Sequence, residues 1–225
     1  MTGGDSIAAI EKSLRRRFRV VETCVQIDEQ TLNILHPASA EDLINEIDFD
    51  RDERLPYWAE LWPSSRALAE FVRPLAGDGR SLLELGCGAG LVATSASLAG
   101  FDVVASDYYE DACRFASVNA SRNGGGPIRG MLLDWRALPP SLGRFDVVVA
   151  SDVLYERPYA ALVAQAIARA LADDGVAFVA DPGRVARKEF LGQLAGEGLT
   201  VRRRTARPFA DGAVRQTITI FEIVR

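Results

Sequence analysis

Short apolar runs alternate with longer amphipathic segments between residues 82 and 195. The apolar runs predict five strands, at residues 82–85, 102–106, 128–133, 145–150 and 176–180. Helical periodicity predicts helices between and after them, at residues 91–99, 109–122, 159–171 and 187–195. Apolar strands that alternate with helices indicate a parallel sheet covered on both faces. We therefore expect an α/β, Rossmann-like, doubly wound fold.

The pattern changes after residue 198. Two β-like runs, at residues 199–203 and 216–224, follow one another with no helical segment between them. The loop that joins them contains Pro208 and Gly212. A connection without a helical crossover pairs two strands antiparallel. The sheet is therefore predicted to have seven strands, mostly parallel, with an antiparallel C-terminal hairpin.

Residues 1–52 have the pattern of a separate extension. Runs rich in Val, Ile, Thr and Leu at residues 19–27 and 31–35 predict a β-hairpin. A short helix is predicted at residues 40–47, after the N-cap candidate Ser39. Residues 1–17 are polar and end in a basic run, which predicts a frayed, solvated helix. We expect this N-terminal hairpin and helix extension to precede a main domain over residues 53–225.

A glycine-rich turn follows the first strand of the alternating region. Residues 84–90 are Glu-Leu-Gly-Cys-Gly-Ala-Gly, so the glycines are Gly86, Gly88 and Gly90. Leu91 stands where the G-x-G-x-x-G motif of dinucleotide sites needs a glycine, which disfavours an NAD-dependent oxidoreductase. The carboxylate of Glu84 would repel a pyrophosphate and suits a ligand that carries an amine.

Acidic and aromatic residues end the next two strands. Asp107 ends the second strand, where a carboxylate accepts ribose hydroxyls. Asp134 and Trp135 end the third, where a carboxylate can accept an adenine amino group and an indole can pack against the ring. Each residue alone also fits a helix cap, a turn or the core. Their coincidence at one edge of the sheet predicts a site for S-adenosylmethionine, a nucleoside with an amine and a sulfonium.

Composition narrows the possible chemistry. The 225 residues include one histidine, His36, and three widely spaced cysteines, Cys24, Cys87 and Cys113. These numbers disfavour a multi-histidine metal site and a C-x-x-C zinc site, so no metal is expected. The net charge of −5 argues against nucleic acid as a partner. With no secretory signal and no apolar run long enough to span a membrane, a cytoplasmic location is expected.

The segment after the fourth strand resembles a known family. Residues 151–155 are Ser-Asp-Val-Leu-Tyr, and residues 57–63 are Tyr-Trp-Ala-Glu-Leu-Trp-Pro. With the glycine turn and the Leu-Asp-Trp at 133–135, they are similar to the seven-β-strand, class I, S-adenosylmethionine-dependent methyltransferases. The D-x-x-Y motif is typical of methyltransferase family 16, a lysine-methyltransferase group. The segment at 57–63 most resembles the branch around the electron-transfer-flavoprotein β-subunit lysine methyltransferase.

This resemblance implies roles for individual residues. It assigns cofactor contacts to the glycine turn and to neighbouring side chains: Trp62, Gly86, Cys87, Gly88, Asp107, Trp135 and Ser151. The positions of Gly90 in the glycine turn and of Asp134 at the end of the third strand add these two residues to the expected cofactor site. It places the acid Glu84 near the methionine end of the cofactor. It places Asp152 and Tyr155 beside the methyl acceptor. The chain lacks the N-P-P-Y motif of adenine and glutamine methylating enzymes, which disfavours those acceptors.

The favoured function is methylation of a protein side-chain nitrogen, with lysine preferred. An ammonium with an ordinary pKa of about 10.4 is too weak an acid for a carboxylate to deprotonate, so Asp152 is expected to align the acceptor. Tyr155 is expected to shape the acceptor channel. Three alternatives remain open: an arginine methyltransferase, a small-molecule methyltransferase and an inactive cofactor-binding module. Residues 15–52 and 205–213 are expected to determine which substrate binds.

Overall fold

The computed structural model describes residues 6–40, 43 and 56–225. The predicted helix at 40–47 lies outside these residues, apart from Ala40 and Leu43. The predicted domain boundary between residues 52 and 53 lies outside them too.

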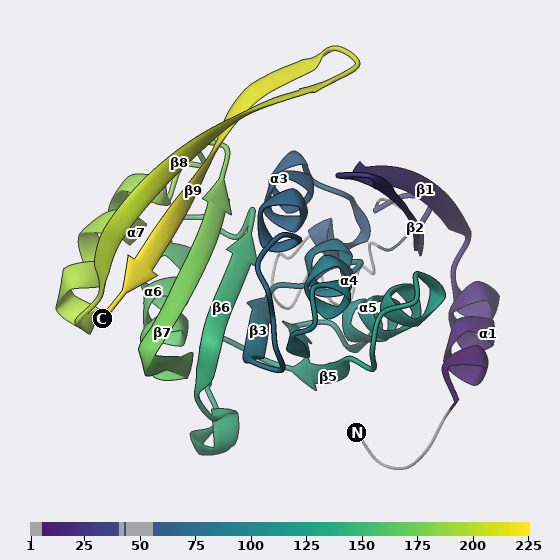
Figure 1. The fold of residues 1–225 in the computed structure, drawn as a ribbon, viewed down its shortest axis with the longest axis horizontal. Helices are drawn as coiled ribbons and strands as arrows, with labels where there is room; N and C mark the ends of the chain where they lie inside the picture. Colours follow the sequence, from purple (N-terminus) through teal and green to yellow (C-terminus); the bar gives the residue numbers. More distant parts are fainter. Residues whose placement is uncertain (1–5, 41–42, 44–55) are drawn as a thin grey trace.

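A seven-stranded sheet forms the centre of the protein (Figure 1). Its strands lie in the order β5-β4-β3-β6-β7-β9-β8. The first five are parallel, β9 is antiparallel to β7, and β8 is antiparallel to β9. This confirms the predicted fold. The strands are β3 (Ser81–Leu85), β4 (Asp102–Asp107), β5 (Arg129–Leu132), β6 (Phe145–Ser151), β7 (Leu171–Asp181), β8 (Thr200–Asp211) and β9 (Val214–Val224).

Two groups of helices cover the two faces of this sheet. One group comprises α3 (Pro63–Val72), α4 (Leu91–Leu98) and α5 (Glu110–Arg122). The other comprises α6 (Tyr159–Ala170) and α7 (Arg187–Gln193). Successive residues of β3 enter different cores: Leu82 packs in the cluster with α3, α4 and α5, and Leu83 in the cluster with α6 and α7. A strand buried on both faces explains the unbroken apolar run.

Short helical turns lie at the ends of these elements: η2 (Tyr57–Ala59), η3 (Pro140–Leu142) and η4 (Leu194–Glu197). In the part of the chain that the structure describes, no helix is both long enough and apolar enough to cross a membrane.

The C-terminal hairpin is longer than the pattern indicates. Residues 205–211, predicted as loop, continue β8 and pair with β9. Pro208 suggested a loop, but β8 is the last strand of the sheet, where a residue without an N–H group is tolerated. Half-buried Thr205, Arg207 and Phe209 alternate with exposed positions, as expected of a strand with one covered face. The paired strands extend beyond β7 as a projecting arm (Figure 1).

The N-terminal extension forms a second layer of structure. Helix α1 (Ile7–Arg17) precedes a two-stranded sheet of β1 (Val20–Ile27) and β2 (Gln30–Pro37), so the hairpin prediction is confirmed. The prediction of a frayed, solvated helix is wrong. Leu14 is fully buried beside Phe115 and Val118 of α5. The guanidinium of Arg17 also donates to both oxygens of Asp111, at 2.6 and 2.7 Å.

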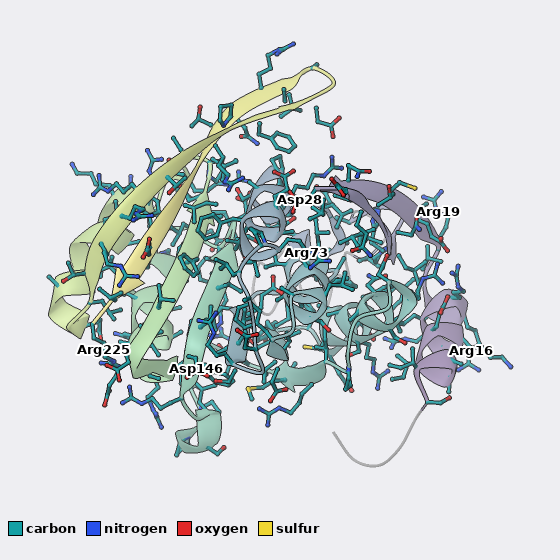
Figure 2. All side chains as sticks on the ribbon, viewed as in Figure 1. Arg16, Arg19, Asp28, Arg73, Asp146 and Arg225 are labelled. Carbon is teal, nitrogen blue, oxygen red and sulfur yellow. The ribbon has the colours of Figure 1, made fainter. Side chains whose placement is uncertain are left out.

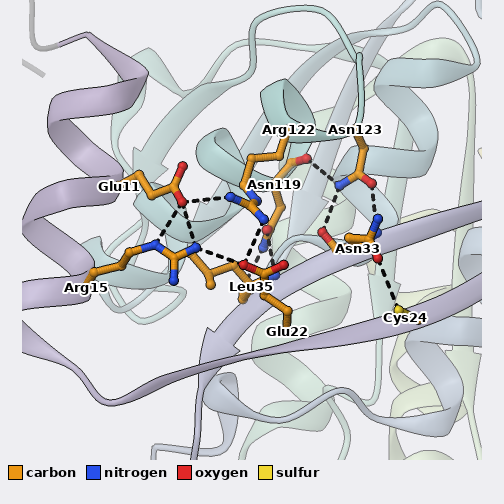
Figure 3. Close-up of polar contacts among 9 residues, drawn as sticks. All are labelled: Glu11, Arg15, Glu22, Cys24, Asn33, Leu35, Asn119, Arg122 and Asn123. Atoms are coloured by element: carbon orange, nitrogen blue, oxygen red, sulfur yellow. Dashed lines mark hydrogen bonds and ion pairs between the residues drawn. The ribbon is translucent and has the colours of Figure 1, made fainter.

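Asn119 of α5 and Asn123, the residue that follows this helix, bond to the backbone of β2 (Figure 3). Asn119 accepts from the N–H of Leu35 and donates to its carbonyl, both at 2.8 Å. Asn123 does the same for Asn33, at 2.8 and 3.1 Å. The two amides therefore occupy the edge of β2 that β1 leaves open. Around them, Arg15 and Arg122 pair with Glu11 and Glu22.

Polar side chains form hydrogen bonds across the amino-terminal edge of the central sheet. Asp146, which is labelled in Figure 2, lies at the start of β6 and accepts from the N–H and hydroxyl of Ser81 at the start of β3, at 2.8 and 2.7 Å. Arg144 and Arg225 both donate to the carbonyl of Leu171 at the start of β7. The opposite, carboxyl-terminal edge is where parallel sheets of this type bind ligands.

Candidate functional site

A pocket opens at the carboxyl ends of β3, β4 and β6. Its walls include all but one of the residues that the sequence predicts as a site: Trp62, Gly86, Cys87, Gly88, Gly90, Asp107, Asp134, Trp135, Ser151, Asp152 and Tyr155. Glu84 is the exception, as it does not line this pocket in the described structure. The fold therefore brings residues from five separate segments together around one space.

The glycine turn forms the floor of the pocket between β3 and α4. Gly90 has φ +81°, and a Cβ there would lie 2.3 Å from the Cα of Ala116. A glycine is required because α4 begins in direct contact with α5. Gly86 has φ +71°, and a Cβ there would touch the ring of Trp135 at 3.5 Å. The turn therefore needs glycines for two reasons: the positive φ of its backbone and the short distance to neighbouring atoms.

Asp107 holds the glycine turn from the end of β4. One carboxylate oxygen accepts from the N–H of Gly88 at 3.0 Å, and the other accepts from the N–H of Tyr109 at 3.0 Å. The residue is 7% exposed. Burial raises the pKa of this carboxyl to about 6, against the opposing effect of the two N–H groups. Asp107 lines the pocket, and a carboxylate that accepts two N–H groups can accept further hydrogen bonds from a ligand.

Glu84 lies buried in β3, at the root of the glycine turn. Burial raises its pKa well above the ordinary range, and the charge of Asp107 adds to that shift. One of its carboxyl oxygens has no hydrogen-bond partner among the described residues. Burial likewise raises the pKa of the Cys87 thiol, so this cysteine contributes a neutral side chain and its backbone.

The end of β5 presents a paired acid and a buried indole. The guanidinium of Arg136 donates to both oxygens of Asp134, at 2.7 to 3.1 Å, and lies over the ring of Tyr108. The indole of Trp135 packs edge-on against Tyr159, with ring centroids 5.7 Å apart. Its N–H is buried and has no partner within the described part of the chain. Trp135 therefore belongs both to the pocket wall and to the core beneath it.

Asp152 lies at the other end of the pocket, just beyond β6. Its backbone is in the left-handed region, with φ +59°, and its N–H donates to the carbonyl of Ala180 at 3.0 Å. Its Oδ1 accepts from Nε of Arg184 at 2.5 Å. Its Oδ2 is buried and has no partner among the residues described. One oxygen of this carboxylate is thus engaged and the other is left for a ligand.

Aromatic rings surround this second carboxylate. Tyr155 packs against Tyr57 and Tyr159, with centroid separations of 5.3 and 5.0 Å. Trp62 donates from its indole N–H to the carbonyl of Tyr57 at 3.0 Å, and the guanidinium of Arg184 lies 5.1 Å from its ring. Burial raises the pKa of Tyr155 well above its ordinary value. Its hydroxyl therefore stays protonated at neutral pH.

Three of these residues are absent from the sequence prediction: Tyr57, Tyr159 and Arg184. Tyr57 begins the aromatic segment at 57–63, and Arg184 follows the fifth parallel strand at the same sheet edge as the other site residues. For Arg184, the position just after a parallel strand is the sequence feature that could have identified it as a site residue. Trp58 packs with Phe18, Phe115 and Tyr109 as well as lining the pocket.

The charge of the pocket limits what it can bind. Among the described residues its walls carry five carboxylates and one arginine: Glu60, Asp107, Asp134, Asp152, Glu156 and Arg136. That arginine is paired with Asp134. Such a lining suits a cationic, aromatic ligand without phosphates. A nucleoside with an amine and a sulfonium has this chemistry.

Comparison with known proteins gives consistent results. A family model described as a methyltransferase domain matches residues 57–207. The electron transfer flavoprotein beta subunit lysine methyltransferase of Mus musculus is 32% identical over 108 residues, which cover 47% of this chain and 42% of that protein. The protein-lysine methyltransferase METTL21E of Mus musculus is 33% identical over 117 residues, 46% of this chain and 47% of that protein. The match thus spans about half the length of these curated relatives.

A solved structure agrees on the fold. The magnesium protoporphyrin IX methyltransferase of Synechocystis PCC 6803, crystallised with bound S-adenosylmethionine, has a TM-score of 0.60 and 21% identity. The match covers 82% of this chain and 94% of that one. At this identity the likeness concerns the arrangement of strands and helices, and the chemistry of the site rests on the residues described above.

Proposed function

The chain belongs to the methyltransferase-domain family, and from that premise we propose that it uses S-adenosylmethionine to methylate a lysine side chain of a protein. The single observation that carries this proposal is that two carboxylates line one pocket at different places. Asp107 lies beside the glycine turn, and Asp152 lies at the other end with Oδ2 left for an acceptor. The two acids thus mark a cofactor end and an acceptor end.

The cofactor end has a group for each part of S-adenosylmethionine. In our proposal the glycine turn receives the methionine part, with Glu84 as the buried acid below it. Asp107 accepts the ribose hydroxyls, and Trp135 packs against the adenine ring. Asp134 accepts the adenine amino group, which requires Arg136 to share the carboxylate. When bound, this cofactor supplies an electrophilic methyl group on a sulfonium.

The acceptor end suits an amine. Trp62 and Ser151 line the passage between the two carboxylates, and Tyr155 forms the aromatic wall beside Asp152. Asp152 aligns the acceptor nitrogen through a hydrogen bond, because a carboxylate is too weak a base to deprotonate a lysine ammonium. Orientation of the nitrogen relative to the methyl group is the contribution that such a site makes. The relatives named as lysine methyltransferases favour lysine over arginine or a small molecule.

We also propose that the substrate is a protein in the cytoplasm. Cys24, Cys87 and Cys113 are free thiols, which fits a reducing compartment. The relative's name makes the electron-transfer-flavoprotein β subunit the first candidate substrate to test.

The test is transfer of a tritiated methyl group from S-adenosylmethionine to that β subunit and, in parallel, to total cell protein. Mass spectrometry of the labelled protein identifies the methylated residue. We expect Asp152→Ala to lower the rate by about 100-fold, because alignment of the reacting atoms is lost. Calorimetry should find its cofactor affinity unchanged within about twofold.

Asp173→Ala is the matched control, since the Asp173 side chain is 92% exposed and distant from the pocket. It should label protein at the wild-type rate. Undiminished transfer by Asp152→Ala would contradict the proposed role of this carboxylate. Methylation found on arginine would contradict the proposed substrate class.

A further inference from the structure

A cationic side chain of the protein, Arg184, contacts two residues that line the pocket, Asp152 and Trp62. Arg184 donates from Nε to Oδ1 of Asp152 at 2.5 Å. Its guanidinium lies 5.1 Å from the ring of Trp62. A carboxylate and an aromatic face are the two groups that hold an alkylammonium in proteins. Arg184 therefore makes the contacts that a charged lysine of a substrate would seek.

The backbone around Arg184 is fixed. Its N–H donates to Asp181, at 3.2 Å, as does that of Gly183, at 2.7 Å. Asp181 is fully buried at the end of β7. The N–H of Ala186 donates to the carbonyl of Leu154 at 3.2 Å, which ties this loop to the loop that carries Asp152. The ion pair is thus set by the ends of two neighbouring strands, β6 and β7.

The two oxygens of Asp152 differ as a result. Oδ1 is taken by a guanidinium, which stays protonated at any working pH. Oδ2 is buried, and no described residue bonds to it. An isolated carboxylate would stabilise a lysine as the ammonium, which has no lone pair to attack a methyl group. A carboxylate already neutralised by arginine has no such effect, but it can still accept an N–H.

Resting on the proposed lysine methylation, we infer that Arg184 is a positioning residue that neutralises Asp152, so that the acceptor nitrogen enters beside Oδ2 as a neutral amine. The amine has then already given its proton to water. Its lone pair forms the new N–C bond while the S–C bond breaks and that electron pair stays on sulfur. The product leaves as a methylammonium ion, which takes over the positive charge of the sulfonium.

Other charged groups around this pair do not replace Arg184. Arg187 approaches Asp181 at 3.7 Å rather than Asp152. Burial raises the pKa of Asp181, and its oxygens accept from backbone N–H groups. The other titratable side chains of the pocket outside its cofactor end are phenols and carboxyls, which carry no positive charge: Tyr57, Tyr155, Tyr159, Glu60 and Glu156. Removal of Arg184 therefore leaves an acidic acceptor site.

Arg184→Gln tests the inference, because glutamine keeps a hydrogen-bond donor and removes the charge. The rising limb of the pH profile of kcat should move to a pH about one unit higher, because the loss of a nearby positive charge raises the pKa of the acceptor amine. KM for the protein substrate should fall while kcat at pH 7 falls about tenfold. Arg184→Lys should restore the wild-type profile. Arg157→Gln is the control, because Arg157 is 72% exposed and pairs with Glu189.

A second measurement does not need methyl transfer. Calorimetry with n-butylamine and S-adenosylhomocysteine-loaded protein should show that Arg184→Gln binds the alkylammonium about tenfold more tightly than wild type at pH 7. An unchanged pH profile and unchanged butylamine affinity would overturn the inference. A rise in both kcat and affinity would also overturn it, because Arg184 would then only block the site. Absence of methylation by every variant, wild type included, would instead contradict the proposed function.

Discussion

Asp107 and Asp152 are buried carboxylates at the ends of two strands that flank β3, yet they are held by different groups. Asp107 is held by backbone N–H groups of Gly88 and Tyr109. Asp152 is held by the side chain of Arg184, 32 residues away in the sequence. The carboxylate at the cofactor end is thus held by main-chain groups, and the carboxylate at the acceptor end by a side chain.

This difference separates contacts that most substitutions leave in place from contacts that a single substitution can change. Backbone contacts persist whatever the side chains are, provided that the glycines stay, so they suit a cofactor common to many enzymes. Side-chain contacts such as Arg184 with Trp62 can change by substitution without altering the fold. Three predictions test this contrast.

The largest effect is expected at Gly90. Gly90→Ala forces a positive φ on an alanine and brings its Cβ to 2.3 Å from the Cα of Ala116. The two effects together should lower the free energy of unfolding by about 3 kcal/mol and abolish cofactor binding. Urea denaturation and calorimetry with S-adenosylmethionine measure the two outcomes.

Gly124→Ala is the matched control. Gly124 has φ +79°, but a Cβ there would meet no described atom within 4 Å, so only the backbone strain applies. It should cost about 1 kcal/mol and leave cofactor affinity unchanged. Equal effects at both glycines would mean that the contact between α4 and α5 does not support the site.

An intermediate effect is expected from the pH dependence of Asp107. Its pKa is raised to about 6 in the folded protein, above its ordinary value of 3.8. The stabilisation linked to its protonated form is therefore complete below pH 4 and is lost as the pH rises through 6. The free energy of unfolding of wild type should fall by about 2 to 3 kcal/mol relative to Asp107→Asn across that interval.

Urea denaturation of both proteins from pH 4 to 7.5, without cofactor, measures this difference. A constant gap between the two proteins would contradict the raised pKa. Asp107→Asn should also weaken cofactor binding at pH 7.5, where the wild-type residue is charged.

The smallest effect is expected at Tyr155. Because burial raises its pKa well above the ordinary value, its hydroxyl does not titrate in the working range and transfers no proton. Tyr155→Phe keeps the ring contacts with Tyr57 and Tyr159, so kcat should fall by no more than about threefold. The pH profile should not move. A tenfold loss, or a shift of the rising limb, would indicate that the hydroxyl acts on the acceptor.

The same contrast explains what the sequence predicts. The order of strands and helices follows from apolar runs such as 145–150, and the cofactor end follows from the glycine turn and Asp107, which are local patterns. The position of Arg184 after a strand indicates that it lies at the ligand-binding edge. Its bond to Asp152, like the contact of Tyr57 with Tyr155, depends on how segments distant in the sequence meet. The docking of α1 was missed for the same reason, since its basic run pairs with Asp111 of α5.

The hydrogen bonds that Asn119 and Asn123 form with the backbone of β2 have a consequence for the order in which the protein folds. Residues 30–37 leave the ribosome long before Asn119 and Asn123, on the order of several seconds at ordinary rates of synthesis. An isolated two-stranded hairpin is only marginally stable in water. Strand β2 is therefore made well before the helix whose asparagines complete its hydrogen bonding, and it reaches its final bonding only when that helix has formed.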